Sequence, residues 1–312
     1  MKAVEVRNIK IGEGIPKICV PIVGVTKEDI INEAKTFENI PVDVVEWRVD
    51  WFEGVFDFAK VEDVLQEGAL WCNSIGSCAA GKDAVITIVG FPKDVEEVYF
   101  AEGNILDSAA AGTYLIDMTT TSPQLAIRIY EKAKKNGQHA LDAPVTGGDT
   151  GAKNGTLSIL AGGEEQDFHV CMPLFEAMGK TIVYEGSAGC GQHTKMANQI
   201  MIAGALSGVC EAFAYAQKAG LDMDKLYASV KDGAAASFQL SSLGAKILKD
   251  DYAPGFFLKH FIKDMKIAAQ EAKDRDVNLE VLNTVLEMYE TLEDKGMGDL
   301  GTQGLMKYYE ES

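Results

Sequence analysis

The sequence is poor in the patterns that mark several common classes of protein. Its six cysteines are scattered, and none forms the Cys-x-x-Cys spacing of a zinc site or a redox motif. Its four histidines are unclustered, which argues against a multi-histidine metal site. No run of 18 apolar residues is present, and the charged N-terminal segment lacks the apolar core of a signal peptide. We therefore expect no metal, no membrane partner, reduced thiols and a cytoplasmic location.

The sequence also has few basic residues relative to acidic ones. Among 312 residues, 47 acidic side chains outnumber 29 basic ones, which gives a net charge of −18. Phosphate backbones are repelled by such a field, so we expect no nucleic-acid partner, although a small anion in a locally positive pocket is compatible with it. The apolar fraction of 47% is ordinary for a folded protein, and the length suits two domains or one large one.

The first half of the chain alternates strand-like runs with amphipathic helical stretches. Strands are expected at 17–24, 42–49, 83–90, 113–118, 139–143 and 156–162. Helices are expected at 27–37, 94–100 and 122–137. Because the strands are almost continuously apolar and alternate with helices, the pattern predicts a mostly parallel sheet covered on both faces. Residues 76–83 are rich in glycine and alanine, so we expect a loosely packed linker there rather than a helix.

From Gly189 onward the sequence has little strand signal. Residues 190–220 predict one long helix of about 30 residues, roughly 45 Å in length. Further helices are expected at 224–232, 237–250, 262–275 and 279–295. The fold class predicted is therefore α/β, with a Rossmann-like, mostly parallel sheet domain over residues 1–185 followed by an all-helical domain over residues 186–312.

The stretch LDAPVTGG (141–148) carries the first candidate site. A strand there runs into the turn Thr146-Gly147-Gly148, where adjacent glycines allow backbone N–H groups to converge on an anion beside a hydroxyl. The alternative interpretation is a glycine-rich loop that only turns the chain.

Two further motifs place charged side chains on helices. In GCGQHTKMANQ (189–199), Lys195 and Asn198 are three residues apart and so share a helix face. A lysine whose pKa is lowered by burial can exchange a proton, although His193 in the same motif is an alternative acid or base. In FIKDM (261–265), Lys263 lies near the start of a helix, where it either faces a cleft or is exposed.

In this order, the motifs resemble those of the β-hydroxyacid dehydrogenases, which include 3-hydroxyisobutyrate dehydrogenase and tartronate semialdehyde reductase and are 6-phosphogluconate dehydrogenase-like. The resemblance covers residues 66–312 and includes DAVITIVGFPKDVEEVYF, LIDMTTTSP, DAPVTGG, GTLSILAGG, GQHTKMANQ and FIKDM. It implies an enzyme that transfers a hydride between NAD or NADP and a small 3-hydroxy acid or its semialdehyde. It also implies that the helical domain mediates formation of a homodimer or homotetramer.

The resemblance assigns roles to individual residues. Lys195 corresponds to the catalytic lysine of the family. The residues implied to bind a small carboxylate substrate are Thr146, Gly147, Gly148 and Asn198. Those implied to contact the cofactor are Gly24, Val89, Gly90, Thr120 and Lys263.

The cofactor fingerprint G-x-G-x-x-G is missing from the first strand and turn. Of its glycines only Gly24 is present, and Thr26-x-x-Asp29 forms a capping box that occupies N–H groups needed for a pyrophosphate. Glu28 and Asp29 add negative charge at the same helix end. Loss of this cradle predicts impaired activity, and a catalytically silent scaffold is one alternative.

Residues 1–65 resemble instead the N-terminus of type I 3-dehydroquinate dehydratase, a (β/α)₈ barrel. The matching motif is EWRVD, in which Glu46 and Arg48 are implied to contact substrate. The chain is thus interpreted as a chimera with a seam near Leu65-Gln66, and a dehydratase-like lyase is the second alternative. Both folds are built from right-handed β-α-β crossovers, so such a junction is physically feasible.

Overall fold

The structure is a computed structural model that describes residues 4–6, 9–11, 19–22, 44–47 and 72–310. Short strands β1 (Val4–Val6) and β2 (Ile9–Ile11) pair antiparallel. Strands β3 (Cys19–Ile22) and β4 (Val44–Trp47) pair in parallel, within the strands predicted at 17–24 and 42–49. The predictions made for Gly24, the helix at 27–37, the capping box and Arg48 lie outside the described residues.

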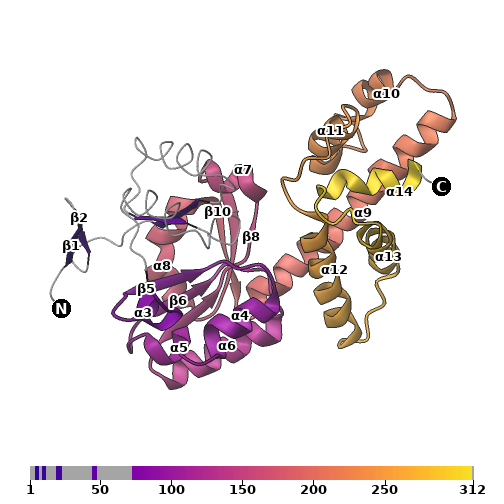
Figure 1. The fold of residues 1–312 in the computed structure, drawn as a ribbon. Coiled ribbons are helices and arrows are strands. Elements are labelled where there is room, and N and C mark those ends of the chain that lie inside the picture. Colours follow the sequence, from indigo (N-terminus) through magenta and orange to yellow (C-terminus); the bar gives the residue numbers. More distant parts are fainter. Residues whose placement is uncertain (1–3, 7–8, 12–18, 23–43, 48–71, 311–312) are drawn as a thin grey trace.

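Residues 72–186 contain a six-stranded, mostly parallel sheet (Figure 1). Its strands are β5 (Ala84–Thr87), β6 (Tyr114–Asp117), β7 (His139–Asp142), β8 (Val145–Thr146), β9 (Leu157–Gly162) and β10 (Gly179–Gly186). Their order is β10-β9-β7-β6-β5, with β8 paired to β9 beside this path. β5, β6 and β7 run parallel, as do β9 and β10, while β9 is antiparallel to β7 and β8.

Helices cover both faces of this sheet because successive side chains of a strand point to opposite sides. Leu115 of β6 packs into one apolar cluster, and the next residue, Ile116, packs into another. The helices around the first cluster are α3 (Ile75–Ala79), α4 (Pro92–Phe100), α5 (Ile105–Ser108) and α6 (Pro123–Lys135). On the other face, α8 (Glu165–Met178) contributes Phe168 and Phe175. The Rossmann-like α/β architecture predicted from the sequence is therefore confirmed.

The loosely packed linker predicted at 76–83 was wrong in part. Ser74 and Ser77 form a reciprocal capping box that starts the short helix α3. A Cβ atom placed on Gly76 would lie 2.6 Å from Ser108 Oγ and 2.9 Å from Gly103 O, so α3 packs closely against its neighbours. The glycine there permits close approach of α3 to α5, and Ala79 is buried beneath it.

Residues 190–310 are helical, as predicted. They form α9 (Cys190–Lys218), α10 (Met223–Val230), a π-helical turn (Gln239–Gly244), α11 (Ala245–Ile247), α12 (Leu258–Lys273), α13 (Glu280–Asp294), a 3-10 turn (Thr302–Leu305) and α14 (Met306–Glu310). One apolar core holds them together and includes Phe213 of α9, Phe261 of α12 and Tyr289 of α13. The rings of Phe261 and Tyr289 meet edge to face at 5.3 Å.

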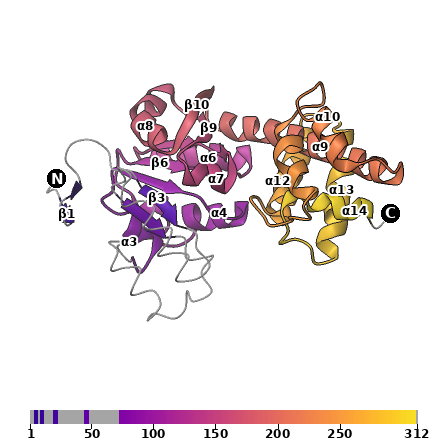
Figure 2. The same cartoon turned by 90° about the horizontal axis from the view of Figure 1, so that it is seen from above.

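Helix α9 connects the two parts of the molecule (Figure 2). Its first turns contact strand β9, and its remaining length contacts α12, α13 and α14. Among the described residues it is the one helix long and apolar enough to cross a membrane by length and composition, a test that core helices also pass. Its buried apolar side chains from Met196 to Phe213 lie in the helical core, which explains its apolar character.

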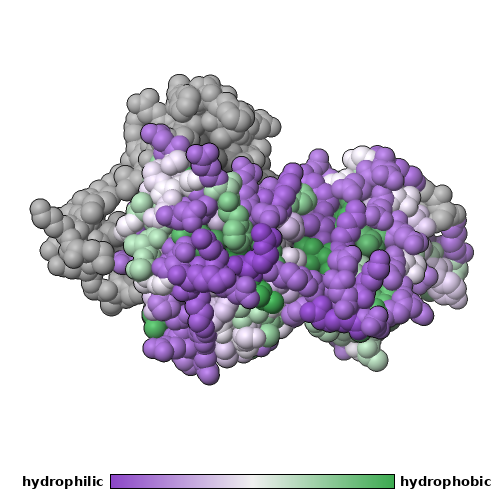
Figure 3. Space-filling model, turned by 90° about the horizontal axis from the view of Figure 1, so that it is seen from below, coloured by the Kyte–Doolittle hydropathy of each residue, from purple (hydrophilic) through white to green (hydrophobic). Residues whose placement is uncertain are grey.

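The face of the molecule seen in Figure 3 is mostly hydrophilic. Figure 3 shows hydrophilic residues over both the sheet part and the helical part, with apolar residues gathered in small patches between them. The many hydrophilic residues on this face agree with the 24% of charged residues in the sequence.

Candidate active site

Lys195 lies in the second turn of α9, at the junction between the helical part and the sheet. Its Nζ donates a hydrogen bond of 2.8 Å to Val145 O, at the start of β8. The residue is only 7% exposed, and removal of the ammonium group from water lowers its pKa. The nearby carboxylate of Asp264 opposes this shift, and the charge of Lys263 adds to it. The result is a buried amine that is easier to deprotonate than an ordinary lysine.

A buried polar chain from α9 and α12 adjoins this lysine. The carboxylate of Asp264 is 1% exposed and accepts a hydrogen bond of 2.6 Å from Gln199 Nε2. Its other oxygen lies 3.0 Å from Lys263 Nζ, an ion pair between neighbouring residues of α12. Lys263 in turn donates to Thr120 O at 2.7 Å. Three helical side chains thus join α9 and α12 to the loop after β6.

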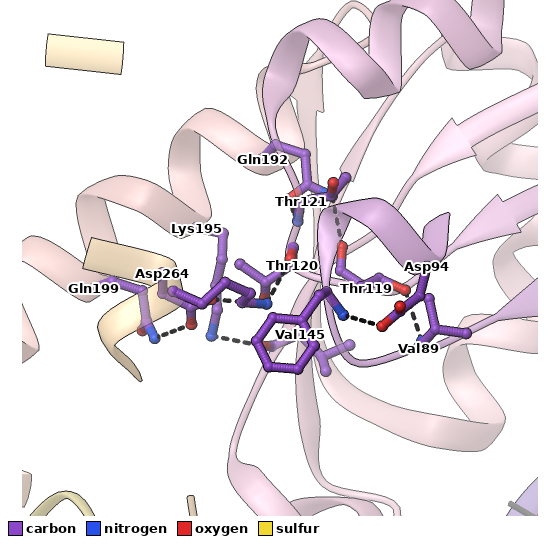
Figure 4. A network of polar contacts seen from close by, with 12 residues as sticks. Val89, Asp94, Thr119, Thr120, Thr121, Val145, Gln192, Lys195, Gln199 and Asp264 are labelled. Carbon is purple, nitrogen blue, oxygen red and sulfur yellow. Dashed lines mark hydrogen bonds and ion pairs between the residues drawn. The ribbon is translucent and has the colours of Figure 1, made fainter. Parts of the chain in front are cut away.

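The loops after β5 and β6 meet at the carboxyl edge of the sheet (Figure 4). The backbone N–H of Val89 donates to Thr119 Oγ1 at 2.9 Å and so links the two loops. The N–H of Phe91 donates to Asp94 Oδ2 at 2.8 Å, which starts α4. Ligands of open α/β sheets bind outside this edge, and Lys263 brings a positive charge to it.

The glycine turn predicted to bind substrate follows directly after the strand that Lys195 contacts. Gly147 and Gly148 both have positive φ angles, of 129° and 60°, a conformation that side chains disfavour. Helix α7 (Gly148–Lys153) begins there. A Cβ atom on Gly148 would lie 3.3 Å from Gly255 O, so the turn approaches the loop that precedes α12.

The structure brings some of the predicted site residues into contact with one another and leaves others apart. Lys263 bonds to Thr120 O, and the same loop holds Val89 N through Thr119. Lys195 lies close enough to Lys263 and Asp264 for their charges to shift its pKa, and it bonds to Val145 O, next to Thr146. The side-chain amide of Asn198 donates to Gln199 Oε1 at 2.8 Å, so it reaches the network only through that residue.

His193, the alternative acid or base, belongs to a different group. Its Nε2 lies 2.9 Å from Arg275 Nη2, and Arg275 is paired with Glu271 at 2.6 Å. Partial burial and the Arg275 charge lower the pKa of His193. Within the part of the chain that the structure describes, no cluster of three potential metal ligands is present.

The sequence did not single out the residues that join α9 to the sheet. The carboxylate of Asp142 accepts from Gly189 N at 2.7 Å and from Gln192 N at 2.9 Å, so a side chain from β7 caps α9. The side chain of Gln192 bonds to Thr119 O and to Thr121 N. The available signals were the position of Asp142 at a strand end and of Gln192 three residues before Lys195.

This combination of features defines a class of protein. A mostly parallel α/β sheet presents its carboxyl edge to a helical part, and a buried lysine lies between them with a basic side chain over the loop after β6. Such an arrangement is that of a two-part oxidoreductase with a nucleotide-binding sheet domain.

Comparisons with known proteins lead to the family. The family model for the NAD binding domain of 6-phosphogluconate dehydrogenase matches residues 47–186. The model for the NAD-binding part of NADP-dependent 3-hydroxyisobutyrate dehydrogenase matches residues 189–309. A third model, for type I 3-dehydroquinase, matches residues 18–73, in keeping with the resemblance of the N-terminal segment.

Individual relatives agree with this result. The chain is 48% identical over 250 residues to an uncharacterized oxidoreductase of Bacillus subtilis (strain 168), a match that covers 80% of this chain and 87% of that protein. It is 42% identical over 249 residues to a probable 3-hydroxyisobutyrate dehydrogenase-like protein of Arabidopsis thaliana, covering 80% and 74%. Its fold matches the crystal structure of 3-hydroxyisobutyrate dehydrogenase from Salmonella typhimurium with a TM-score of 0.75, at 23% identity, over 93% and 99%. The chain belongs to the 3-hydroxyisobutyrate dehydrogenase family of β-hydroxyacid dehydrogenases.

Proposed function

We propose that this protein is an NAD(P)-dependent oxidoreductase that interconverts a small 3-hydroxy acid and its semialdehyde. The observation that carries the proposal is the buried amine of Lys195, held 2.8 Å from Val145 O beside the glycine turn. Family membership and the NAD binding domain model support the same class of reaction. When bound, the nicotinamide ring supplies or accepts the hydride.

Lys195 exchanges the proton in this proposal. Because burial lowers its pKa, the amine can lose its proton when a hydroxyl is oxidised and return it when an aldehyde is reduced. Asp264, paired with Lys263 and Gln199, counteracts this shift and favours the protonated amine. The two effects together suit a group that serves as both acid and base.

The substrate carboxylate is assigned to the turn Thr146-Gly147-Gly148, with Asn198 as a second contact. The positive φ angles of both glycines direct the backbone of the turn away from an ordinary strand path. The turn follows Val145, so an anion bound there lies beside the Lys195 amine. Holding the reacting carbon and the amine in one cleft supplies much of the rate of such enzymes.

The described residues fit the nicotinamide half of a dinucleotide. Val89, Gly90 and Thr120 line the carboxyl edge of β5 and β6, and Lys263 provides a partly buried cation there. We assign these four residues to the cofactor. Gly24, assigned to the pyrophosphate end, lies outside the described residues. Either NAD or NADP satisfies these contacts, and the missing G-x-G-x-x-G weakens binding of both.

The proposal also covers the domains, the oligomeric state, the location and the partners of the protein. We assign residues 1–185 to the cofactor domain, with residues 1–65 derived from a barrel-like segment, and residues 186–312 to the helical domain. The separate dehydroquinase match at 18–73 supports the chimera. We propose a cytoplasmic homodimer or homotetramer that acts on a small carboxylate and engages neither nucleic acid nor membrane.

The test is an assay with several outcomes. Purified protein is mixed with NADH or NADPH and small semialdehydes, and loss of absorbance of the reduced cofactor is followed. Turnover supports the proposal. Absence of turnover together with saturable cofactor binding rejects the hydride-transfer assignment, and absence of both indicates a silent scaffold. Formation of an enone from 3-dehydroquinate would instead establish the lyase alternative suggested by residues 18–73.

A further inference from the structure

One buried side chain connects the two halves of the proposed site. Gln192 of α9 is 0% exposed, and both ends of its amide are bonded to the loop after β6. Its Nε2 donates to Thr119 O at 2.8 Å, and its Oε1 accepts from Thr121 N at 3.0 Å. The amide therefore spans Thr120, which is assigned to the cofactor (Figure 4).

The loop receives a third bond from the helical part. Lys263 Nζ donates to Thr120 O at 2.7 Å, between the two contacts of Gln192. Three consecutive loop residues are thus bonded through their backbone by side chains of α9 and α12. Because the same loop holds Val89 N through Thr119 Oγ1, its position also determines that of the turn after β5.

The backbone of Gln192 is fixed as firmly as its side chain. Its N–H donates to Asp142 Oδ2 at 2.9 Å, and that carboxylate also caps Gly189 N. A Cβ atom on Gly191 would collide with Leu160 O and Asp142 O, so the start of α9 fits closely against the sheet. Lys195 lies three residues further along α9, less than one helical turn from Gln192.

We propose that Gln192 is a positioning residue that sets the distance between the cofactor loop Thr119–Thr121 and the amine of Lys195. It touches neither reacting group and acts through the loop on one side and through α9 on the other. The inference rests on the proposed function. It predicts that a variant without the amide retains its fold and substrate binding but transfers hydride poorly, because misplacement by about 1 Å costs about 10²-fold in rate.

The test compares Gln192→Met with a matched control. Methionine has a similar length and fills the space without hydrogen bonds. Gln138 is the control because it is also buried, and its amide donates to Leu106 O and Ala109 O at 2.9 and 2.7 Å, in contacts separate from the site. Gln138→Met therefore removes a comparable buried amide and reports the purely structural effect.

Two measurements are made on each variant. Hydrogen exchange of the peptide containing Thr121 is followed without cofactor, and Gln192→Met should exchange about 10-fold faster there, since the N–H loses its acceptor. In the assay, Gln192→Met should lose about 10²-fold in kcat with little change in substrate KM. Gln138→Met should leave both the Thr121 exchange and kcat at their original values.

A third variant provides rescue. In Gln192→Glu the introduced carboxyl group donates to Thr119 O only when protonated, so activity relative to wild type should recover as the pH is lowered. Equal kcat for Gln192→Met and wild type would overturn the positioning role while leaving the proposed function intact. Equal losses of kcat in Gln192→Met and Gln138→Met would also overturn it. A wild-type protein without turnover would reject the proposed function and this inference with it.

Discussion

At the scale of single residues, Lys195 is the group whose removal should have the largest effect on turnover. Lys195→Ala deletes the buried amine that donates to Val145 O. We expect kcat to fall by about 10²–10⁴-fold, the range typical of a positioned proton donor. The measurement is steady-state oxidation of reduced cofactor, with circular dichroism to verify the fold.

The control for this prediction is Lys266→Ala. Lys266 is on α12, as Lys263 is, but it is half-exposed and paired with Glu290 at 2.8 Å. Its removal should leave kcat unchanged, since exposed ion pairs contribute at most about 1 kcal/mol. An undiminished kcat in Lys195→Ala would assign the proton transfer to another group.

Asp117 gives a prediction about stability rather than turnover. Its Oδ1 accepts from Thr87 Oγ1 and from Thr119 N, but its buried Oδ2 has no partner. Burial raises its pKa from 3.8 to about 6. Between these values the folded protein keeps a proton that the unfolded chain has lost. The free energy of unfolding therefore falls by on the order of 3 kcal/mol as the pH rises through this range.

Asp117→Asn removes this dependence because the amide does not ionise. Urea unfolding at pH 4 to 8 should show the variant gaining stability relative to wild type as the pH rises, with no further gain well above pH 6. Asp232→Asn, at a highly exposed position, is the control and should give a difference of unfolding free energies that varies little with pH. If the difference in unfolding free energy between Asp117→Asn and wild type were equally independent of pH, burial would not raise the pKa of Asp117.

At the scale of elements, two of the glycines of α9 have opposite surroundings. A Cβ atom on Gly191 would collide with Leu160 O and Asp142 O, whereas one on Gly208 meets nothing within 4 Å. Gly191→Ala should therefore destabilise the protein by about 3 kcal/mol or more, since backbone atoms must shift. Gly208→Ala should stabilise it by about 0.5–1 kcal/mol through helix propensity.

Thermal unfolding of the two variants tests this difference. The melting temperature should fall for Gly191→Ala and rise by a few degrees for Gly208→Ala. Both substitutions add one methyl group to the same helix. Opposite changes in melting temperature would therefore be caused by the close contact between Gly191 and the sheet. Equal shifts would mean that the sheet accommodates the methyl group by moving.

The elements of the fold differ in how far the sequence could predict them. The strands at 84–87, 114–117, 139–142 and 157–162 were predicted because each carries a short apolar run between helical patterns. Strand β10 was missed, since most residues of this edge strand are only partly buried or exposed and its polar residues interrupt any apolar run. Helix α8 was missed as well, and it contains Pro173, which normally argues against a helix interior.

The residues of the site also fall into those that the sequence could predict and those that it could not. Lys195, Thr120 and Lys263 were found because each belongs to a local motif. Gln192 and Asp142 were not, because their roles depend on partners 47 to 73 residues distant in the sequence. A glutamine or aspartate that is buried in the fold has the same local sequence pattern as an exposed one, so only the three-dimensional structure distinguishes them.

At the scale of the whole molecule, the proposed cofactor binding depends on an N-terminal segment whose sequence lacks the G-x-G-x-x-G fingerprint. Thr26 and Asp29 occupy the second and third glycine positions of G-x-G-x-x-G counted from Gly24. Thr26→Gly/Asp29→Gly restores this spacing and removes a carboxylate. We expect NADH to bind at least about 10-fold more tightly, because backbone N–H groups then become available to the pyrophosphate.

Titration of NADH fluorescence measures this change. The control, Thr26→Ala/Asp29→Ala, removes the same hydroxyl and carboxylate without the backbone freedom of glycine. An equal gain in affinity in the two variants would attribute the gain to removal of the carboxylate alone. Unchanged affinity in both would place the cofactor contacts of this chain elsewhere.

The length of α9 has a mechanical consequence for the whole molecule. Its 29 residues extend from the junction with the sheet to the far end of the helical part. If the helical part swings as a rigid lever about Gly191, Lys195 is only about 6 Å from the fulcrum, while Lys218 is about 40 Å away. A swing of about 10° would carry the far end through about 7 Å but Lys195 through only about 1 Å. Even this small displacement of the amine matters, because about 1 Å of misplacement costs about 10²-fold in rate, so the close fit of α9 at Gly191 should protect turnover as well as stability.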